Sequence, residues 1–250
     1  GRGHEVIQDY GRTKKIFSDK NFILKYIKQK NKNLKKDFKF NILKETSKQK
    51  YFLTKSKIRM ASINSKEINK NDIFFAVKGK KRDGNLFLKE AFSNGASLAV
   101  VNRINKFVKK NKQIKVKNSL DFLTKTSKIV RENSKGKIIA ITGSCGKTSL
   151  KELLTKTLAK FSKVTSSPKS FNNKFGVPLS LFNLNKNDDF GIFEVGMDKK
   201  GEIDNLTKII KPDIGIITNV SYAHAKNFKS LKHIAMAKSE IINNIVKDGS

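Results

Sequence analysis

A short run of small and polar residues is the part of the chain most able to do chemistry. It follows the apolar residues 138–141, precedes leucines at helical spacing, and reads Gly143-Ser144-Cys145-Gly146-Lys147-Thr148. In a strand–loop–helix context, backbone N–H groups and the positive end of the helix converge on phosphate oxygens, while a lysine adds a point charge and a threonine hydroxyl can reach Mg²⁺. The longer general pattern asks for glycine where this chain has Ile141, so the match is to the tighter form GxxGKT. The sequence therefore predicts a loop that binds nucleotide phosphates, with Cys145 at a variable position and without a catalytic role.

Two further polar residues follow apolar stretches that have strand composition. Glu194 comes near the end of residues 190–195, two positions before Gly196, and His224 comes shortly after residues 214–218. Ligands of open α/β sheets bind outside the carboxyl ends of the strands, where both residues are expected. A histidine in a loop is more often a surface or packed residue than a ligand, so the residues alone leave the role of His224 open.

A lysine interrupts the apolar stripe of a helix near the C-terminal end. The residues Leu231, Ile234, Lys238, Ile241 and Ile245 step by three and four positions, which places Lys238 among apolar side chains. It could extend its amine to the solvent, or it could be buried with a lowered pKa. A neutral amine can react with CO₂ to give a carbamate, which is an anion able to hold Mg²⁺. The pattern leaves both alternatives open.

The elements around these residues predict two α/β units. In the first, residues 72–77 and 98–101 are expected strands, separated by a loop and by a helix at Leu88 to Phe92 that Gly95 caps. In the second, we expect strands at 138–141, 190–195 and 214–218 and a helix at about 202–210. This order predicts an α/β fold in which the second unit is a P-loop ATPase-like domain with a mostly parallel sheet.

The charge of the chain is lopsided, with 54 Lys and Arg against 21 Asp and Glu and a net charge of +33. Only six of the 54 cations are arginines, and there is no Trp and little Tyr, so the stacking and bidentate groups typical of nucleic-acid binding are scarce. The abundance of Lys, Asn, Ile and Phe is the usage that AT-rich codons would give. We therefore interpret most of the charge as a solvated surface and predict no specific nucleic-acid partner.

The cysteine count and the apolar runs indicate the compartment. A single cysteine excludes a disulfide framework and a cysteine-based metal cluster. The apolar runs are far shorter than the roughly 18 to 20 residues that a bilayer requires, and the first residues lack the apolar core of a signal peptide. The sequence predicts a cytoplasmic, monomeric protein without membrane insertion.

Five segments resemble, in order and spacing, the central domain of the Mur ligases. They are GSCGKTSLKE (143–152), SFNNKFGVPLSL (170–181), EVGMDKKGEI (194–203), ITNVSYAHAKNF (217–228) and IAMAKSEI (234–241). Residues 61–66 and 71–101 resemble the N-terminal domain of the same family, which holds a uridine nucleotide. There the family usually has Asp-Ser-Arg where this chain has Asn64-Ser65-Lys66, and His where it has Asn85. The resemblance implies a uridine-nucleotide contact at Ser65.

The first residues carry a second resemblance. The run GRGHEVIQDYGRTKKIFSD (1–19) is similar to the extreme C-terminus of the Mur ligases that add the third amino acid of the peptide. In those ligases the matching residues contact meso-diaminopimelate, which implies that Gly1 and Glu5 bind substrate. The chain then reads as the junction of two fused ligases, truncated at both ends: 1–30 from the first ligase, 31–118 as the N-terminal substrate domain of the second, and 119–250 as its incomplete central domain.

The resemblance implies an ATP-dependent amide ligase that adds D-alanyl-D-alanine to UDP-N-acetylmuramoyl-tripeptide through an acyl phosphate, in the synthesis of peptidoglycan precursors. Its catalytic residues would be Lys147, Lys238 and His224. Mg²⁺ would be held by Thr148 and Glu194 at one site, and by His224 and carbamylated Lys238 at a second. Asn172 and Asn173 would contact substrate or phosphate. ATP would bind the residues of the phosphate loop, which are Gly143, Ser144, Cys145, Gly146, Lys147, Thr148 and Ser149.

Two alternatives remain. One is another amide ligase of the same superfamily, of the folylpolyglutamate or cyanophycin synthetase type. The segment NNxxGVPL and the motifs of residues 61–101 argue against it. The other is a basic P-loop ATPase that acts on nucleic acid, against which the cation and aromatic composition argues. We expect the 250-residue chain alone to bind nucleotide weakly and not to turn over.

Overall fold

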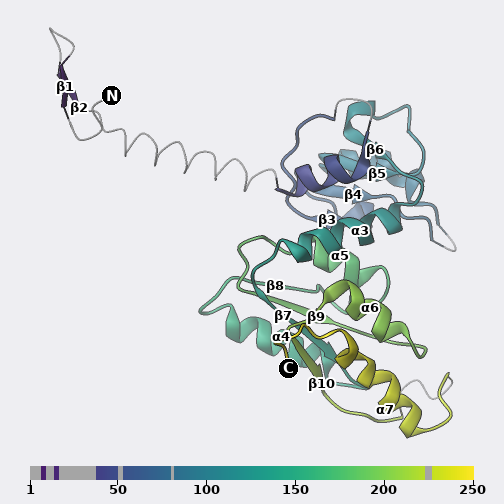
Figure 1. Ribbon diagram of the computed structural model, residues 1–250. Helices are drawn as coiled ribbons and strands as arrows, with labels where there is room; N and C mark the ends of the chain where they lie inside the picture. The colour runs from purple at the N-terminus through teal and green to yellow at the C-terminus, as the bar shows by residue number, and fades with distance from the viewer. Residues whose placement is uncertain (1–6, 10–13, 17–37, 50–52, 80–81, 223–226) are drawn as a thin grey trace.

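Two four-stranded parallel sheets, each with its own helices, make up most of the described structure (Figure 1). The computed structural model describes residues 7–9, 14–16, 38–49, 53–79, 82–222 and 227–250. Within them, β1 (Ile7–Asp9) and β2 (Lys14–Ile16) pair as a short antiparallel ladder. The predicted α/β class with parallel sheets is confirmed.

The N-terminal sheet has the strand order β3-β4-β5-β6, and all its pairs are parallel. The strands are β3 (Ala61–Ser62), β4 (Ile73–Phe75), β5 (Leu98–Val101) and β6 (Gln113–Lys115). The short helix α2 (Leu88–Ser93) connects β4 to β5, as predicted, and Gly95 follows it with a φ of +108°. The 3₁₀ turns are η1 (Ser65–Glu67), η2 (Gly84–Phe87) and η3 (Lys110–Lys112). Every residue of β4 and β5 is buried, as expected for strands covered on both faces.

The central sheet has the order β10-β7-β9-β8 and is also parallel. Its strands are β7 (Lys137–Thr142), β8 (Val164–Ser166), β9 (Phe190–Glu194) and β10 (Ile214–Ile217). The helices are α3 (Ser119–Glu132), α4 (Lys147–Leu158), α5 (Gly176–Phe182), α6 (Glu202–Ile210) and α7 (Leu231–Ser239), which continues into η5 (Glu240–Asn244). The helix predicted at about 202–210 has those bounds. The strands predicted at 138–141, 190–195 and 214–218 are present within a residue or two.

Side chains alternate across β7 and divide the helices between the two faces of the central sheet. Ile139 and Ile141 pack toward α4, whereas Ile138 and Ala140 join the larger core that includes α3, α5 and α6. The leucine pattern from 150 to 161 is only partly a buried stripe. Leu153 is 62% exposed, and Phe161 lies beyond the end of α4 and is 84% exposed. One face of the helix is enough to cover the sheet.

The two sheets share one continuous core. Phe75 of the N-terminal sheet meets Phe182 of α5 edge to face, with ring centroids 5.4 Å apart. Next to them, the carboxamide of Asn183 accepts a hydrogen bond from the N–H of Ala61 at 2.7 Å and donates one to its carbonyl at 3.2 Å. Asn183 thus pairs with β3 as a neighbouring strand would, which joins the two units through backbone polar groups.

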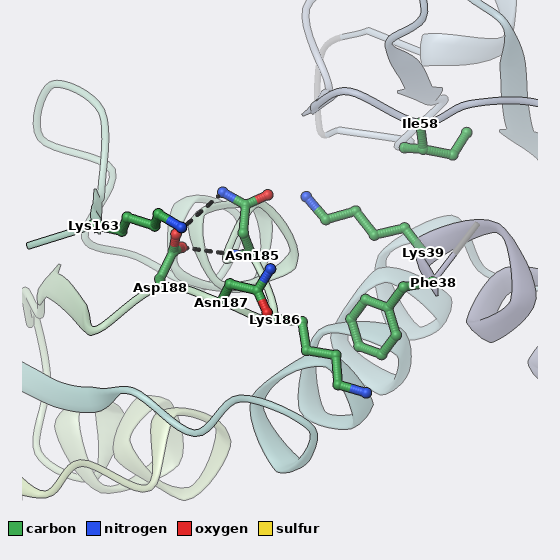
Figure 2. Close-up of a pocket in the computed structure, with 8 residues that line it drawn as sticks. All are labelled: Phe38, Lys39, Ile58, Lys163, Asn185, Lys186, Asn187 and Asp188. Carbon is green, nitrogen blue, oxygen red and sulfur yellow. Dashed lines mark hydrogen bonds between the residues drawn. The ribbon is translucent and has the colours of Figure 1, made fainter. Parts of the chain in front are cut away.

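A buried lysine lies beside this junction. Lys39, in the helical residues 38–47, donates to the carbonyl of Asn183 at 3.2 Å and lies over the ring of Phe182. Burial lowers its pKa to about 8 despite the nearby carboxylates of Asp188 and Asp72. Lys39 lines a cavity of about 340 Å³ together with Phe38, Ile58, Lys163, Asn185, Lys186, Asn187 and Asp188. Figure 2 shows these side chains.

None of the helices in the described part of the chain is both long and apolar enough to cross a bilayer.

Candidate functional site

The loop between β7 and α4 has the geometry that its sequence predicts. Gly143 and Gly146 have φ values of +149° and +79°, which residues other than glycine rarely adopt. Helix α4 begins directly afterwards at Lys147. A Cβ added to Gly143 would lie 1.9 Å from the hydroxyl oxygen of Thr218, so the position has no room for a side chain. The amine of Lys147 folds back and donates to the carbonyl of Gly143 at 2.7 Å. The strand–loop–helix arrangement that phosphate binding requires is therefore present.

The segment after β10 holds this loop in place. The side-chain oxygen of Asn219 accepts from the N–H groups of Ser144 and Cys145 at 3.1 and 3.0 Å. The hydroxyl of Thr218 donates to the carbonyl of Cys145 at 2.6 Å, and that of Ser144 donates to the carbonyl of Ser221 at 2.9 Å. Sequence reasoning missed Thr218 and Asn219, although both lie in the segment 217–228 that carries the resemblance.

A buried carboxylate stands at the carboxyl end of β9, beside the start of α4. Glu194 is 1% exposed, and its two oxygens accept from the hydroxyl of Thr148 and from the carboxamide of Asn172, each at 2.7 Å. The hydroxyl of Ser170 lies 3.5 Å from that of Thr148. Thr148 and Glu194, expected to share one magnesium ion, therefore meet Asn172, which was expected to contact substrate or phosphate.

This group has the chemistry of a magnesium site that phosphates complete. Mg²⁺ is usually held by one or two carboxylates together with substrate phosphates and waters, and Thr148 and Glu194 supply a hydroxyl and a carboxylate next to the phosphate loop. Among the described residues, no three His, Cys, Asp or Glu side chains gather as a metal cluster. A site that needs a phosphate ligand fits this donor set better than an all-protein cage does.

Lys238 is buried. Lys238 lies on α7 and is 2% exposed. The alternative in which its amine extends to the solvent therefore does not hold. Desolvation, and then the charge of Lys147, lower its pKa to about 8, which the nearby Cys145 partly opposes. A much larger fraction of this amine is neutral near physiological pH than for an exposed lysine. That is the condition that carbamate formation requires.

The remaining predicted site residues are distributed differently. The side-chain oxygen of Asn173 accepts from the N–H groups of Phe175 and Gly176 and caps α5. Ser65 is buried in the N-terminal unit, where its hydroxyl donates to Glu90. The structure thus brings neither of them to Glu194. Gly1, Glu5 and His224 lie outside the described residues.

A cationic cavity of about 480 Å³ lies between the two units. Its lining combines the loop after β4, the end of β5 and the start of α3 with residues ahead of α5, namely Lys78, Gly79, Asn102, Lys117, Asn118, Leu120, Lys174 and Phe175. Buried Asn85 supports this wall, because its carboxamide accepts from the N–H of Asn102 at 3.1 Å and donates to Asp83 at 2.7 Å. Three lysines and no acid line the cavity, so it suits an anion.

Comparison with known proteins gives this geometry a family. Residues 141–250 match the Mur ligase middle domain. Over 185 residues the chain is 43% identical to the UDP-N-acetylmuramoyl-tripeptide–D-alanyl-D-alanine ligase of Rickettsia prowazekii. The matched residues are 74% of this chain and 41% of that protein. The chain belongs to the Mur ligase family. The ligase of the same name from Buchnera aphidicola subsp. Baizongia pistaciae is 37% identical over 194 residues, or 77% of this chain and 42% of that protein.

Solved Mur ligases share the fold. MurF from Acinetobacter baumannii superposes with a TM-score of 0.72 at 30% identity, over 84% of this chain and 46% of that one. MurF ligase from Thermotoga maritima, in complex with ADP, gives 0.63 at 35% identity, over 76% and 44%. The chain therefore spans about two fifths of the length of the curated Mur ligases that it matches.

Proposed function

We propose that this chain is part of an ATP-dependent ligase that joins D-alanyl-D-alanine to UDP-N-acetylmuramoyl-tripeptide during peptidoglycan precursor synthesis. The observation that carries the proposal is the meeting of Thr148, Asn172 and Glu194 beside the phosphate loop. Identities of 43% and 37% to ligases of that name support the choice of substrate. Since those substrates are made inside the cell, the proposal implies a cytoplasmic enzyme.

In the proposed reaction, the tripeptide's terminal carboxylate attacks the γ-phosphorus of ATP, and ADP leaves. The amine of D-alanyl-D-alanine then attacks the acyl phosphate, forms the amide and releases phosphate. Lys147 and the N–H groups of the loop would neutralise the charge of the phosphates, and Thr148 and Glu194 would hold Mg²⁺. Mg²⁺ would supply charge neutralisation and orientation of the phosphates. Asn172 orients Glu194 through the hydrogen bond at 2.7 Å.

A second metal site is part of the proposal. The amine of Lys238 attacks the carbon of CO₂ and loses a proton, and the carbamate so formed carries one negative charge. Together with His224 it would hold a second Mg²⁺ near the substrate carboxylate. The burial of Lys238 and its pKa of about 8 support this role, because carbamate formation needs the neutral amine.

We propose that the cationic cavity receives the anionic part of the UDP-sugar. Lys78 and Lys117 come from the N-terminal unit and Lys174 from the central one, so the substrate would lie across the junction at residue 118/119. Ser65 would contribute through the turn η1, and residues 31–118 would then form the substrate domain. For residues 1–30, the proposal remains the end of a ligase that adds the third amino acid, with Gly1 and Glu5 as substrate contacts.

The decisive experiment assays the full-length protein that contains this chain. We expect ADP release that depends on both UDP-N-acetylmuramoyl-tripeptide and D-alanyl-D-alanine. Release that depends instead on folate and glutamate would favour another branch of the superfamily. Release stimulated by DNA or RNA and persisting near physiological ionic strength would favour a nucleic-acid ATPase. The 250-residue chain itself is expected to bind Mg–ATP without turnover.

A further inference from the structure

Lys151 is a charged residue with no exposed surface. It lies on α4 one turn after Lys147, and its side chain is 0% exposed. Burying an ammonium is costly unless its donors are all paired. Here they are paired, because the amine donates to the carbonyls of Ser167, at 2.8 Å, and Lys169, and lies 3.1 Å from the carboxylate of Glu152. The buried amine of Lys151 therefore holds two backbone carbonyls inside the central unit.

Those carbonyls belong to the loop that follows β8, which residues 192–196 hold at its start and at its end. At its start, the N–H of Ser167 donates to the carbonyl of Ile192 at 2.9 Å, and the hydroxyl of Ser167 accepts from the N–H of Glu194 at 3.1 Å. At its end, the carbonyl of Asn172 accepts from the N–H of Gly196 at 2.8 Å. The amine of Lys151 adds hydrogen bonds to the carbonyl at the start of the loop, Ser167, and to the one in its middle, Lys169.

The middle of the loop has a backbone conformation that needs such support. Lys169 has a φ of +49°, in the left-handed region that residues with a Cβ avoid. The carbonyl of this strained residue is one of the two that accept from Lys151. The buried ammonium thus stabilises a turn that the sequence, with lysine rather than glycine at 169, does not favour by itself.

This turn carries the residues that lie next to Thr148 and Glu194, the two proposed magnesium ligands. Ser170 lies 3.5 Å from the hydroxyl of Thr148, and Asn172 donates to Glu194 at 2.7 Å. On its other side, the amine of Lys169 lies 3.0 Å from the carboxylate of Glu67 in η1 of the N-terminal unit. One loop therefore reaches the start of α4, the end of β9 and the substrate unit.

We propose that Lys151 is a positioning residue for the nucleotide–magnesium site: through the carbonyls of Ser167 and Lys169 it fixes the loop that aims Asn172 and Ser170 at Glu194 and Thr148. The inference rests on the part of the proposed function that assigns Mg–ATP binding to this site. It adds a residue that acts through others, without contact to nucleotide or metal. Partners of metal ligands typically change metal affinity by about 10- to 100-fold when they are removed.

The test compares Lys151→Met with Lys156→Met, an exposed lysine of the same helix. Binding of ATP to the 250-residue chain is measured by calorimetry with Mg²⁺ and again with EDTA. We expect Lys151→Met to weaken binding about tenfold with Mg²⁺ and less than about twofold without it, and Lys156→Met to change neither. Equal losses in the two conditions, or no loss, would overturn the proposal. Failure of the unsubstituted chain to bind Mg–ATP would instead refute the proposed function.

A rescue variant separates positioning from plain destabilisation. Lys169→Gly relieves the left-handed strain, so the turn no longer depends on the buried ammonium. In the Lys151→Met background, Lys169→Gly should restore Mg–ATP binding. The logarithm of the dissociation constant should return at least halfway to the value of the unsubstituted chain. Absence of rescue would contradict the proposal.

Should Lys151→Met lose its far-UV circular dichroism and fail to fold, Lys151→Gln is the second variant. It keeps two N–H donors on a side chain one bond shorter, and it carries the same Mg²⁺-specific expectation with a smaller loss. Hydrogen exchange provides a readout that needs no nucleotide. The amides of Asn172 and Gly196 should exchange faster in the variant, while those within α4 remain protected. Unchanged exchange at both amides would again contradict the proposal.

Discussion

Two lysines, Lys151 and Lys238, are buried close to the phosphate loop. Their surroundings differ, and the difference explains why one is proposed to hold a loop and the other to react. Lys151 has two carbonyls and a carboxylate around its amine. Lys238 lies on an apolar stripe near the cation Lys147, without a hydrogen-bond partner for its amine in the described part of the chain, and its pKa falls to about 8. Oxygen acceptors around the amine of Lys151 hold it in one place, whereas desolvation beside another cation favours, at Lys238, a neutral amine that can react.

The largest effect should come from removing the reactive lysine. In the full-length enzyme, Lys238→Ala is expected to lower the rate of ligation by about 100-fold or more, because the second magnesium loses an anionic ligand. A short carboxylic acid supplied in the buffer should restore at least a tenth of the activity. The same acid should not help Lys151→Met, whose defect is not a missing anion. Full activity of unrescued Lys238→Ala would end the carbamate proposal.

The next effect concerns Glu194, the carboxylate at the proposed magnesium site. Glu194→Gln keeps the shape of the side chain but removes its charge, so ATP affinity should fall about 10- to 100-fold with Mg²⁺ and change little with EDTA. Asp198→Asn, an exposed acid a few residues further along, serves as the matched control and should behave like the unsubstituted chain. A loss of the same size in EDTA would mean that Glu194 acts on the loop rather than on the metal.

A third buried lysine tests the cost of poor pairing. Lys39 has one carbonyl acceptor, and its pKa of about 8 lies below the 10.5 of a free lysine. Between these values the unfolded chain binds the proton and the folded chain does not, so this residue makes stability rise as the pH rises from about 8 to 10.5, and its penalty is fully present below 8. Lys39→Met should therefore raise the free energy of unfolding by about 1 kcal/mol at pH 7, after loss of the bond to Asn183.

The gain from Lys39→Met should disappear by pH 10.5. Urea denaturation at the two pH values measures it, with exposed Lys44→Met in the same helical segment as control. A gain that did not depend on pH would show that the ammonium is not the origin of the penalty.

The smallest effect should come from the exposed thiol of the phosphate loop. Cys145→Ser keeps an acceptor near the carboxamide of Asn219, which lies 3.0 Å from the sulfur, and should change ATP affinity by less than about twofold. Because Cys145 raises the pKa of Lys238, its removal should move the pH at which CO₂ activates the enzyme slightly downward. An upward movement would contradict the assigned environment of Lys238.

Local patterns were sufficient for much of the fold and for part of the site. The phosphate loop, the carboxylate at the end of β9 and helix α6 follow from apolar periodicity and from glycine spacing, which are properties of neighbouring residues. The position of Lys238 on an apolar stripe predicted burial as one of two outcomes. The choice between them depended on how α7 packs beside Lys147, which one element cannot reveal.

What the sequence did not predict depends on contacts between distant segments. Lys151 stands between a leucine and a glutamate in an amphipathic helix, and only the loop that arrives from residues 167–169 makes it a buried cation. Asn219 supports Ser144 from 75 positions further along the chain. The sequence predicted the same role for Asn173 as for its neighbour Asn172, but the turn before α5 directs its oxygen to backbone N–H groups.

The crowding at Gly143 also limits which residues can replace this glycine. At solvent-facing positions a substitution usually changes the free energy of unfolding by no more than about 0.5 kcal/mol. At position 143 a new side chain would meet the hydroxyl of Thr218 at 1.9 Å and its backbone nitrogen at 3.2 Å, with φ at +149°. Exchanging Thr218 for a smaller residue would remove only the first obstacle. A substitution at this glycine therefore meets two obstacles, the contact with Thr218 and the backbone conformation, and a change at Thr218 relieves only the contact.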